Sequence, residues 1–271
     1  SMHAELLMIG TELLLGQIED TNAARMARML AKNGIALYQK TTVGDNEARI
    51  QAALRAALER GSVVLCSGGL GPTEDDLTRE CVAAVAEAPL EYHEHLYEAL
   101  KARYLRRRKS IPHNNRKQAT VPKGAHILNN PNGTAPGFIM EMTAYAAAGV
   151  PTPLVACMPG VPKELDPMLK DSVIPFLLAH FGMQGVIHSH VLRSCGLGES
   201  RVDSIIGDLI RQQENPTIGL LASPGAVRIR ITARAEDIPS AEALIHPVAA
   251  AIRERLGDSI QEGEAETLVN P

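Results

Sequence analysis

Short apolar runs alternate with amphipathic segments through the first part of the chain. The runs at 6–9 and 63–66 lead directly into a glycine and a serine, and they are typical of strands buried on both faces. The stretches 21–34 and 46–61 carry apolar residues at three- and four-residue spacing and end in glycine, as helices do. Residues 35–43 alternate like another strand. This order predicts a parallel α/β sheet joined by right-handed crossovers.

Later segments continue the same pattern. We predict strands at 138–140 and 153–158 and a helix over 92–109. Another helix is expected to begin at Pro162, because proline is tolerated in the first turn. Residues 111–123 are polar and contain two prolines, so we expect a mobile segment there.

From about Val186 the chain predicts a smaller unit. A strand at 187–193 and a helix over 199–210 are followed by two alternating strands around Ser223-Pro224-Gly225, which is a hairpin pattern. A last amphipathic helix covers 239–256. The resulting βαββα order is that of a small α+β domain.

We therefore predict two domains, a larger α/β domain over 1–183 and an α+β domain over 184–260. Residues 261–271 are expected to be a tail or linker towards a further region that this chain does not contain.

Composition narrows the function classes. The 271 residues carry a net charge of −4, only 3% are aromatic and none is Trp, which disfavours nucleic-acid binding by base stacking. No apolar run reaches the roughly 18–20 residues of a membrane span. Four scattered cysteines form neither a zinc motif nor a disulfide framework. We expect a cytoplasmic protein with no nucleic-acid or membrane partner.

The nine histidines are scattered along the sequence. His188 and His190 share one face of a predicted strand, and we interpret them as packing or surface residues rather than as ligands.

The stretch 67–78, Ser-Gly-Gly-Leu-Gly-Pro-Thr-Glu-Asp-Asp-Leu-Thr, carries the clearest chemical signal. A glycine turn between a strand and a helix brings backbone N–H groups together, which favours an anion. Asp75 and Asp76 would repel a phosphate unless a divalent cation joined them to it. An ordinary turn followed by an acidic helix cap is the alternative.

Two other turns follow predicted strands, Gly10-Thr11-Glu12 and Gly44-Asp45. The carboxyl ends of parallel strands meet at one edge of a sheet, where ligands of such folds bind. We therefore expect all three segments to meet in one site.

Several motifs resemble the CinA family of competence- and damage-inducible proteins. They are Ile9 to Leu14, Gly44-Asp45-Asn46, Gly68 to Thr73 with Asp75 to Thr78, Gly133 to Phe138, and Pro159-Gly160-Val161-Pro162. The first domain of that family is similar to the molybdopterin-binding domains of MoaB, MogA and gephyrin. The resemblance implies a three-layer, mostly parallel MogA/MoaB-like sheet domain followed by a KH-like α+β domain, and a homodimer.

The CinA branch also resembles ADP-ribose pyrophosphatases. This implies metal-dependent hydrolysis of ADP-ribose to AMP and ribose 5-phosphate, or of a related nucleotide diphosphate. The implied metal ligands for Mg²⁺ or a similar ion are Asp76, Asp45 and Glu12, with Asp75 as an extra catalytic carboxylate and K⁺ as a further candidate cation. The expected substrate-binding residues are Ser67, Gly68, Gly69, Gly71, Thr73, Thr78, Glu12, Asn22, Gly133, Pro159 and Gly160.

Two alternatives stay open. Binding or adenylylation of molybdopterin would use the same fold, although Leu70 stands where the molybdopterin relatives have a threonine. A non-catalytic nucleotide sensor linked to competence would keep its ligand affinity in Asp76→Asn. Full-length CinA proteins usually continue into a nicotinamide-nucleotide amidase domain, and nothing in this sequence resembles its active-site motif, so we expect no deamidase activity.

Overall fold

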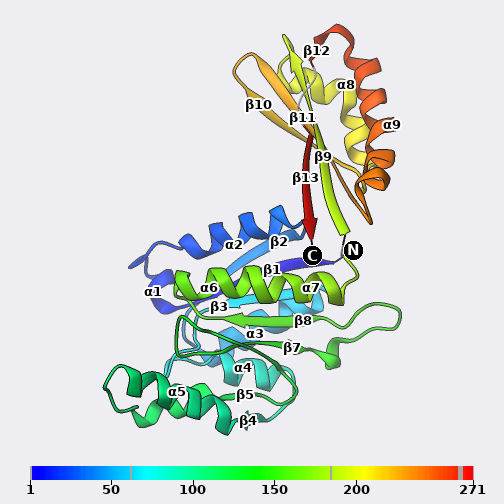
Figure 1. Ribbon diagram of the computed structural model, residues 1–271. Helices are drawn as coiled ribbons and strands as arrows, with labels where there is room; N and C mark the ends of the chain where they lie inside the picture. The colour runs from blue at the N-terminus through cyan, green and yellow to red at the C-terminus, as the bar shows by residue number, and fades with distance from the viewer. Residues whose placement is uncertain (1, 62, 184, 262–264, 271) are drawn as a thin grey trace. The chain divides into compact units, whose positions relative to one another are not determined.

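The computed structural model describes residues 2–61, 63–183, 185–261 and 265–270. The chain divides into two compact units, Ser1–Phe181 and Gly182–Pro271, each with its own sheet and hydrophobic core (Figure 1). Among the described residues, no helix combines the length and the apolar character needed to cross a bilayer.

The first unit is built on a six-stranded sheet in the order β2-β1-β3-β8-β7-β6. Four neighbouring strands pair in parallel, and two further strands at one edge are added through antiparallel pairings. The parallel strands are β1 (His3–Ile9), β2 (Ala36–Val43), β3 (Val63–Ser67) and β8 (Leu154–Met158); the antiparallel ones are β7 (Gly137–Glu141) and β6 (His126–Leu128). The predicted mostly parallel sheet is confirmed.

Helices cover both faces of this sheet, which makes three layers. Figure 1 shows α2 (Thr21–Lys32), α6 (Pro162–Met168) and α7 (Ile174–His180) over one face. The helices α3 (Glu47–Glu59) and α4 (Thr78–Val85) lie over the other. The N-cap side chains of Asp20 and Asn46 accept hydrogen bonds from the first turns of α2 and α3, which fixes where these helices begin. The remaining elements are α1 (Thr11–Leu14), the π-helical turn η3 (Leu169–Val173) and the 3₁₀ turn η2 (Thr143–Tyr145).

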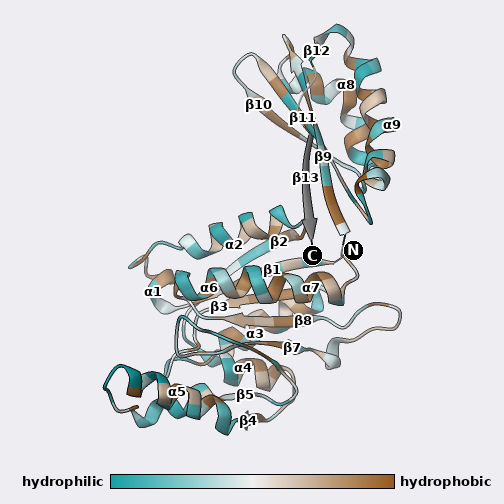
Figure 2. Ribbon diagram, viewed as in Figure 1, coloured by the Kyte–Doolittle hydropathy of each residue, from teal (hydrophilic) through white to brown (hydrophobic). Residues whose placement is uncertain are grey.

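The core of the first unit lies between the sheet and its helices. Figure 2 shows apolar residues concentrated along β3, β7 and β8. Every residue of β3 is buried, as expected for a strand covered on both faces. Because aromatic residues are scarce, aliphatic side chains such as Leu65 and Leu54 fill most of the core, with Phe138 as one of its largest members.

The prediction of a mobile segment at 111–123 is wrong. The structure has the 3₁₀ helix η1 (His113–Ala119) followed by β5 (Thr120–Pro122), which pairs with β4 (Leu90–Tyr92) beside α5 (Glu94–Arg106). Asn115 and Gln118 are buried, and the Asn115 amide donates to Gln118 Oε1 over 2.8 Å. Polar residues that satisfy one another in the interior give the same sequence pattern as a solvated loop.

The second unit has the predicted βαββα order. Its elements are β9 (Gly185–Cys195), α8 (Glu199–Gln212), β10 (Thr217–Ser223), β11 (Ala226–Ala235), α9 (Ile238–Leu256), the 3₁₀ turn η4 (Gly257–Ser259), β12 (Ile260–Gln261) and β13 (Ala265–Asn270). The sheet runs β10-β11-β9-β12, and β13 also pairs with β9. Of the expected tail over 261–271, residues 262–264 and 271 lie outside the described residues, whereas the rest adds strands to this sheet.

Because β3 is buried, replacing one of its leucines should lower the stability of the protein far more than replacing an exposed leucine. Leu65 is fully buried and Leu105, on α5, is 74% exposed. We expect Leu65→Ala to lower the free energy of unfolding by about 2–5 kcal/mol, because it removes apolar contacts and leaves a cavity. The matched Leu105→Ala change should stay within about 0.5 kcal/mol. Urea unfolding followed by circular dichroism measures both, and equal effects would contradict this placement of the core.

Candidate active site

The glycine turn after β3 has a backbone that only glycine fits. Gly68 has φ +101°, and a Cβ there would lie 2.3 Å from the carbonyl oxygen of Ile9. Gly69 has φ +71°, and a Cβ would lie 2.1 Å from Thr78 Oγ1. The same Thr78 hydroxyl donates to the Gly68 carbonyl over 2.8 Å. The turn is therefore folded tightly between the end of β1 and the start of α4.

A buried arginine that sequence reasoning missed supports this turn from within. Arg79 has no exposed surface, and its guanidinium donates to the carbonyl oxygens of Leu70 and Gly71. Burial lowers its pKa to about 10, opposed by the nearby Glu80 and Asp76 carboxylates, so the side chain stays charged at neutral pH. In the sequence Arg79 follows Thr78 near the start of a helix, where a charged side chain is usually exposed. Only the tertiary structure shows that Arg79 is buried.

Residues of the segment 113–119 hold the same loop from its outer side. Lys117 Nζ donates to the carbonyl oxygens of Thr73 and Asp76 over 2.7 and 2.6 Å. Gln118 donates to Thr134 Oγ1 over 3.0 Å and lines the site. Sequence reasoning misses both residues, because their polar, proline-containing segment predicts a mobile loop.

Two carboxylates each hold a turn of the site, Asp76 within the glycine loop and Asp45 in the turn after β2. Asp76 Oδ2 accepts from the Thr73 N–H and hydroxyl over 3.0 and 2.7 Å. Asp45 Oδ2 accepts from the Thr11 N–H over 3.2 Å, and the Asp45 N–H donates back to Thr11 Oγ1 over 3.0 Å. Each carboxylate thus has one oxygen engaged in holding a turn.

These turns meet in one cleft of about 610 Å³ at the carboxyl ends of the parallel strands. Twelve of the fourteen sequence-predicted site residues line it, namely Glu12, Asn22, Asp45, Ser67, Gly68, Gly69, Gly71, Thr73, Asp75, Asp76, Pro159 and Gly160. Thr78 instead lies buried beneath the glycine turn. Gly133 lies in a neighbouring depression beside α5.

Some of the hydrogen-bond donors predicted to bind a ligand are already used within the protein. The Gly68 N–H donates to the carbonyl of Met158 over 3.0 Å, and both Thr73 donors are taken by Asp76. In the part of the chain that the structure describes, the N–H groups of Gly69 and Gly71 have no protein acceptor. Of the glycine and Thr73 donors predicted to bind an anion, the N–H groups of Gly69 and Gly71 are therefore the ones that remain available.

Gly133 has a different role from the predicted contact with a ligand. A Cβ at Gly133 would lie 1.6 Å from Glu164 Oε1, so the glycine makes room for that carboxylate. Asn130 donates to the same Oε1 over 2.7 Å. Glu164 lines the cleft and was not singled out from the sequence, where it reads as an acidic first-turn residue of α6.

Asn22 crosses the cleft to the turn after β8. Its Nδ2 donates to the Gly160 carbonyl over 2.7 Å. Gly160 also lies close to Gly68, since a Cβ at Gly160 would be 3.6 Å from the Gly68 Cα. Its Oδ1 is buried and, within the described residues, has no hydrogen-bond donor. A buried acceptor in a cleft is a place where a ligand hydroxyl or amine would bind.

The three predicted metal ligands share the cleft without forming a closed cage. Among the described residues, Glu12, Asp45 and Asp76 are not a group whose ligand atoms all lie within 4.8 Å of one another. Their chemistry still suits a hard cation, because Mg²⁺ keeps several waters and uses only one or two carboxylates. The free oxygens of Asp45 and Asp76 fit that mode of binding.

The comparisons with known proteins cover both units. Residues 5–179 match the family described as a probable molybdopterin binding domain, and residues 189–260 match the damage-inducible protein CinA KH domain. CinA-like proteins of Dictyoglomus thermophilum and Gloeobacter violaceus are both 43% identical, over 266 and 267 residues that make up 98% of this chain. The chain spans 62% and 61% of those two relatives.

The solved structure of the protein CinA from Thermoplasma acidophilum is also similar, with 33% identity and a TM-score of 0.56. The match covers 64% of this chain and 98% of that one. Together with the two family matches and the observed sheets, this confirms the predicted MogA/MoaB-like sheet domain followed by a small α+β domain. The chain belongs to the CinA family, with a molybdopterin-binding-type domain followed by a CinA KH domain.

Proposed function

We propose that the first domain is a metal-dependent hydrolase of the diphosphate in ADP-ribose or a related nucleotide diphosphate. Water would add to one phosphorus while the bridging P–O bond breaks, which yields AMP and ribose 5-phosphate from ADP-ribose. The observation that carries the proposal is the meeting of backbone N–H donors and several carboxylates in one cleft of about 610 Å³. That volume lies in the usual range of small-molecule sites.

The carboxylates argue for a cation together with an anion. Glu12, Asp45, Asp76 and Glu164 all line the cleft, and a diphosphate alone would be repelled by them. The residues that would hold the ion are Asp45, Asp76 and Glu12. A bound Mg²⁺ would neutralise the diphosphate and promote the attack of water.

Different protein groups would bind different parts of the substrate. The N–H groups of Gly69 and Gly71 would bind phosphate oxygens, and the Arg79 guanidinium keeps their loop in place. The buried Asn22 Oδ1 would accept a hydrogen bond from a sugar hydroxyl. Pro159 and Gly160 would close the same side of the cleft over the sugar or base.

Molybdopterin binding is the second candidate, favoured by the family description of residues 5–179. Leu70 speaks against it. Its side chain is 2% exposed and belongs to the hydrophobic core, so at this position the turn presents no hydroxyl to a ligand. Titration with molybdopterin separates the two functions, because submicromolar binding without ADP-ribose turnover would favour the pterin.

Asp76→Asn should abolish most of the turnover while leaving the fold intact. The asparagine oxygen can still accept from Thr73, but the charge that holds the cation is lost, so we expect kcat to fall by about 10²–10⁴. Asp45→Asn should behave alike. The measurement is AMP release from ADP-ribose with Mg²⁺ and after EDTA treatment.

Glu74→Gln is the matched control, because Glu74 is exposed, lies in the same loop and does not line the cleft. Wild-type protein that is folded but inactive with every divalent cation tried would refute the hydrolase. ADP-ribose binding that is unchanged in Asp76→Asn, without any turnover in wild type, would favour a sensor.

Gly71→Ala should reduce turnover without a large loss of stability. A Cβ at Gly71 would lie 2.5 Å from Asp76 Oδ2, so the carboxylate must move away from Thr73. The backbone there needs no left-handed conformation, so the fold should tolerate alanine. We expect kcat for ADP-ribose to fall by about tenfold or more, since small misplacements of catalytic groups have effects of this order. Gly219→Ala, where a Cβ meets no atom within 4 Å, is the control, and equal activities would contradict this role for Asp76.

A further inference from the structure

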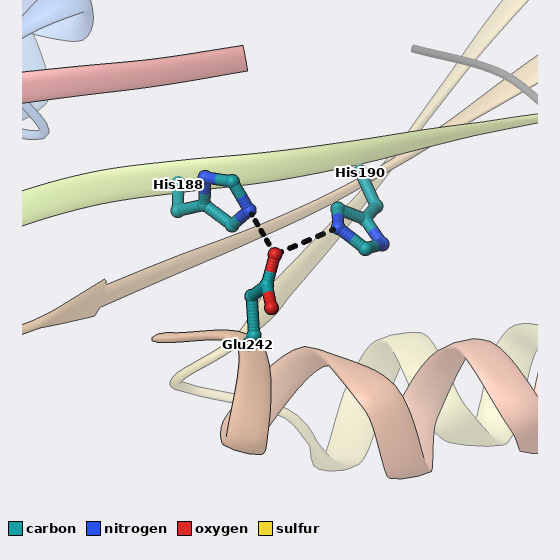
Figure 3. Close-up of side chains that lie close together, drawn as sticks. All are labelled: His188, His190 and Glu242. Atoms are coloured by element: carbon teal, nitrogen blue, oxygen red, sulfur yellow. Dashed lines mark ion pairs between the residues drawn. The ribbon is translucent and has the colours of Figure 1, made fainter. Parts of the chain in front are cut away.

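The second unit contains a cluster of side chains that its βαββα frame does not require. His188 and His190 occupy alternate positions of β9 and therefore project from the same face of the strand. Ser189, between them, hydrogen-bonds to Thr232 of the neighbouring strand over 2.8 Å. Figure 3 shows both imidazoles turned towards one carboxylate, that of Glu242 on α9.

The ligand atoms of this cluster lie near the spacing of a coordination site. Glu242 Oε1 lies 3.3 Å from His188 Nε2 and 3.9 Å from His190 Nε2. One ligand atom from each of the three residues lies within 4.8 Å of the other two. Tetrahedral Zn²⁺ with bonds of about 2.0–2.2 Å needs ligand atoms roughly 3.3–3.5 Å apart. His188 and Glu242 already match this spacing, whereas His190 must move closer to complete the site.

We propose that His188, His190 and Glu242 bind a divalent transition metal of the Zn²⁺ class. Two imidazole nitrogens and one carboxylate oxygen suit Zn²⁺, Co²⁺ or Ni²⁺, whereas Mg²⁺ and Ca²⁺ prefer sites made of oxygen alone. Three protein ligands leave the fourth tetrahedral position for water or another small ligand.

The surroundings allow a metal to enter and be held. His188 is 4% exposed, so one ligand is fixed within the packed interior. The side chains of His190 and Glu242 are 22% and 39% exposed, which leaves a path from solvent.

A metal at this site would fasten α9 to β9, the strand that β11 and β13 flank. The site lies within the second unit, so it is independent of the hydrolase proposed for the first. Its ligands also differ in kind from the all-oxygen ligands of that cleft, so the two sites can be tested separately.

The test is a titration of the full chain, freed of metal by chelation, with Co²⁺ at neutral pH. We expect a visible absorption band of four-coordinate Co²⁺ that saturates at one equivalent per chain and disappears when Zn²⁺ is added. Glu242→Gln and His190→Gln should each weaken Co²⁺ binding by at least about tenfold, since even outer-shell changes have effects of that size. Circular dichroism confirms that these variants are folded.

Two controls make the result specific. Glu254→Gln alters an exposed carboxylate on the same helix and should leave the Co²⁺ affinity unchanged. The double variant Asp45→Asn/Asp76→Asn should keep the absorption band, because it alters only the cleft of the first unit. The absence of a band with micromolar Co²⁺, or a band of unchanged affinity in both Glu242→Gln and His190→Gln, would overturn the proposal.

Discussion

The candidate active site depends on one buried charge. Arg79 has no exposed surface, yet its guanidinium is held by the carbonyl groups of Leu70 and Gly71. A buried charge is tolerated only with such polar partners, and in return it fixes the backbone that provides them. These hydrogen bonds hold the carbonyl groups of the glycine turn inward at the carboxyl end of β3. The N–H groups of Gly69 and Gly71 thereby become available to a ligand.

The site is assembled from segments that come together only in the folded sheet. The Asp45 carboxylate links the turn after β2 to the turn after β1, and Asn22 links α2 to the turn after β8. Each link is a hydrogen bond between a side chain and a backbone group, and such bonds fix the conformation of loops that bury few apolar side chains. The parallel strands supply the common edge, so the chemistry of the cleft follows from sheet topology as well as from residue type.

Several residues act through another residue rather than on a ligand. Thr78 and Gly133 were expected to contact substrate, but Thr78 holds the Gly68 carbonyl and Gly133 makes room for Glu164. Gly133 still owes its residue type to the site, because a Cβ there would displace the Glu164 carboxylate. In the second unit, Glu242 joins β9 to α9 in a comparable way through His188 and His190.

The sequence by itself determined the strands and helices that build the parallel sheet, the separate βαββα unit and twelve residues that line the cleft, but not β4, β5, β6 or β13. These are local properties, since apolar period, glycine turns and capping residues act over a few positions. Tertiary structure alone decided that Arg79 is buried, that Lys117 and Gln118 brace the glycine loop, and that Glu242 faces two histidines. Each of these depends on which distant segments pack together, and no short-range pattern records that.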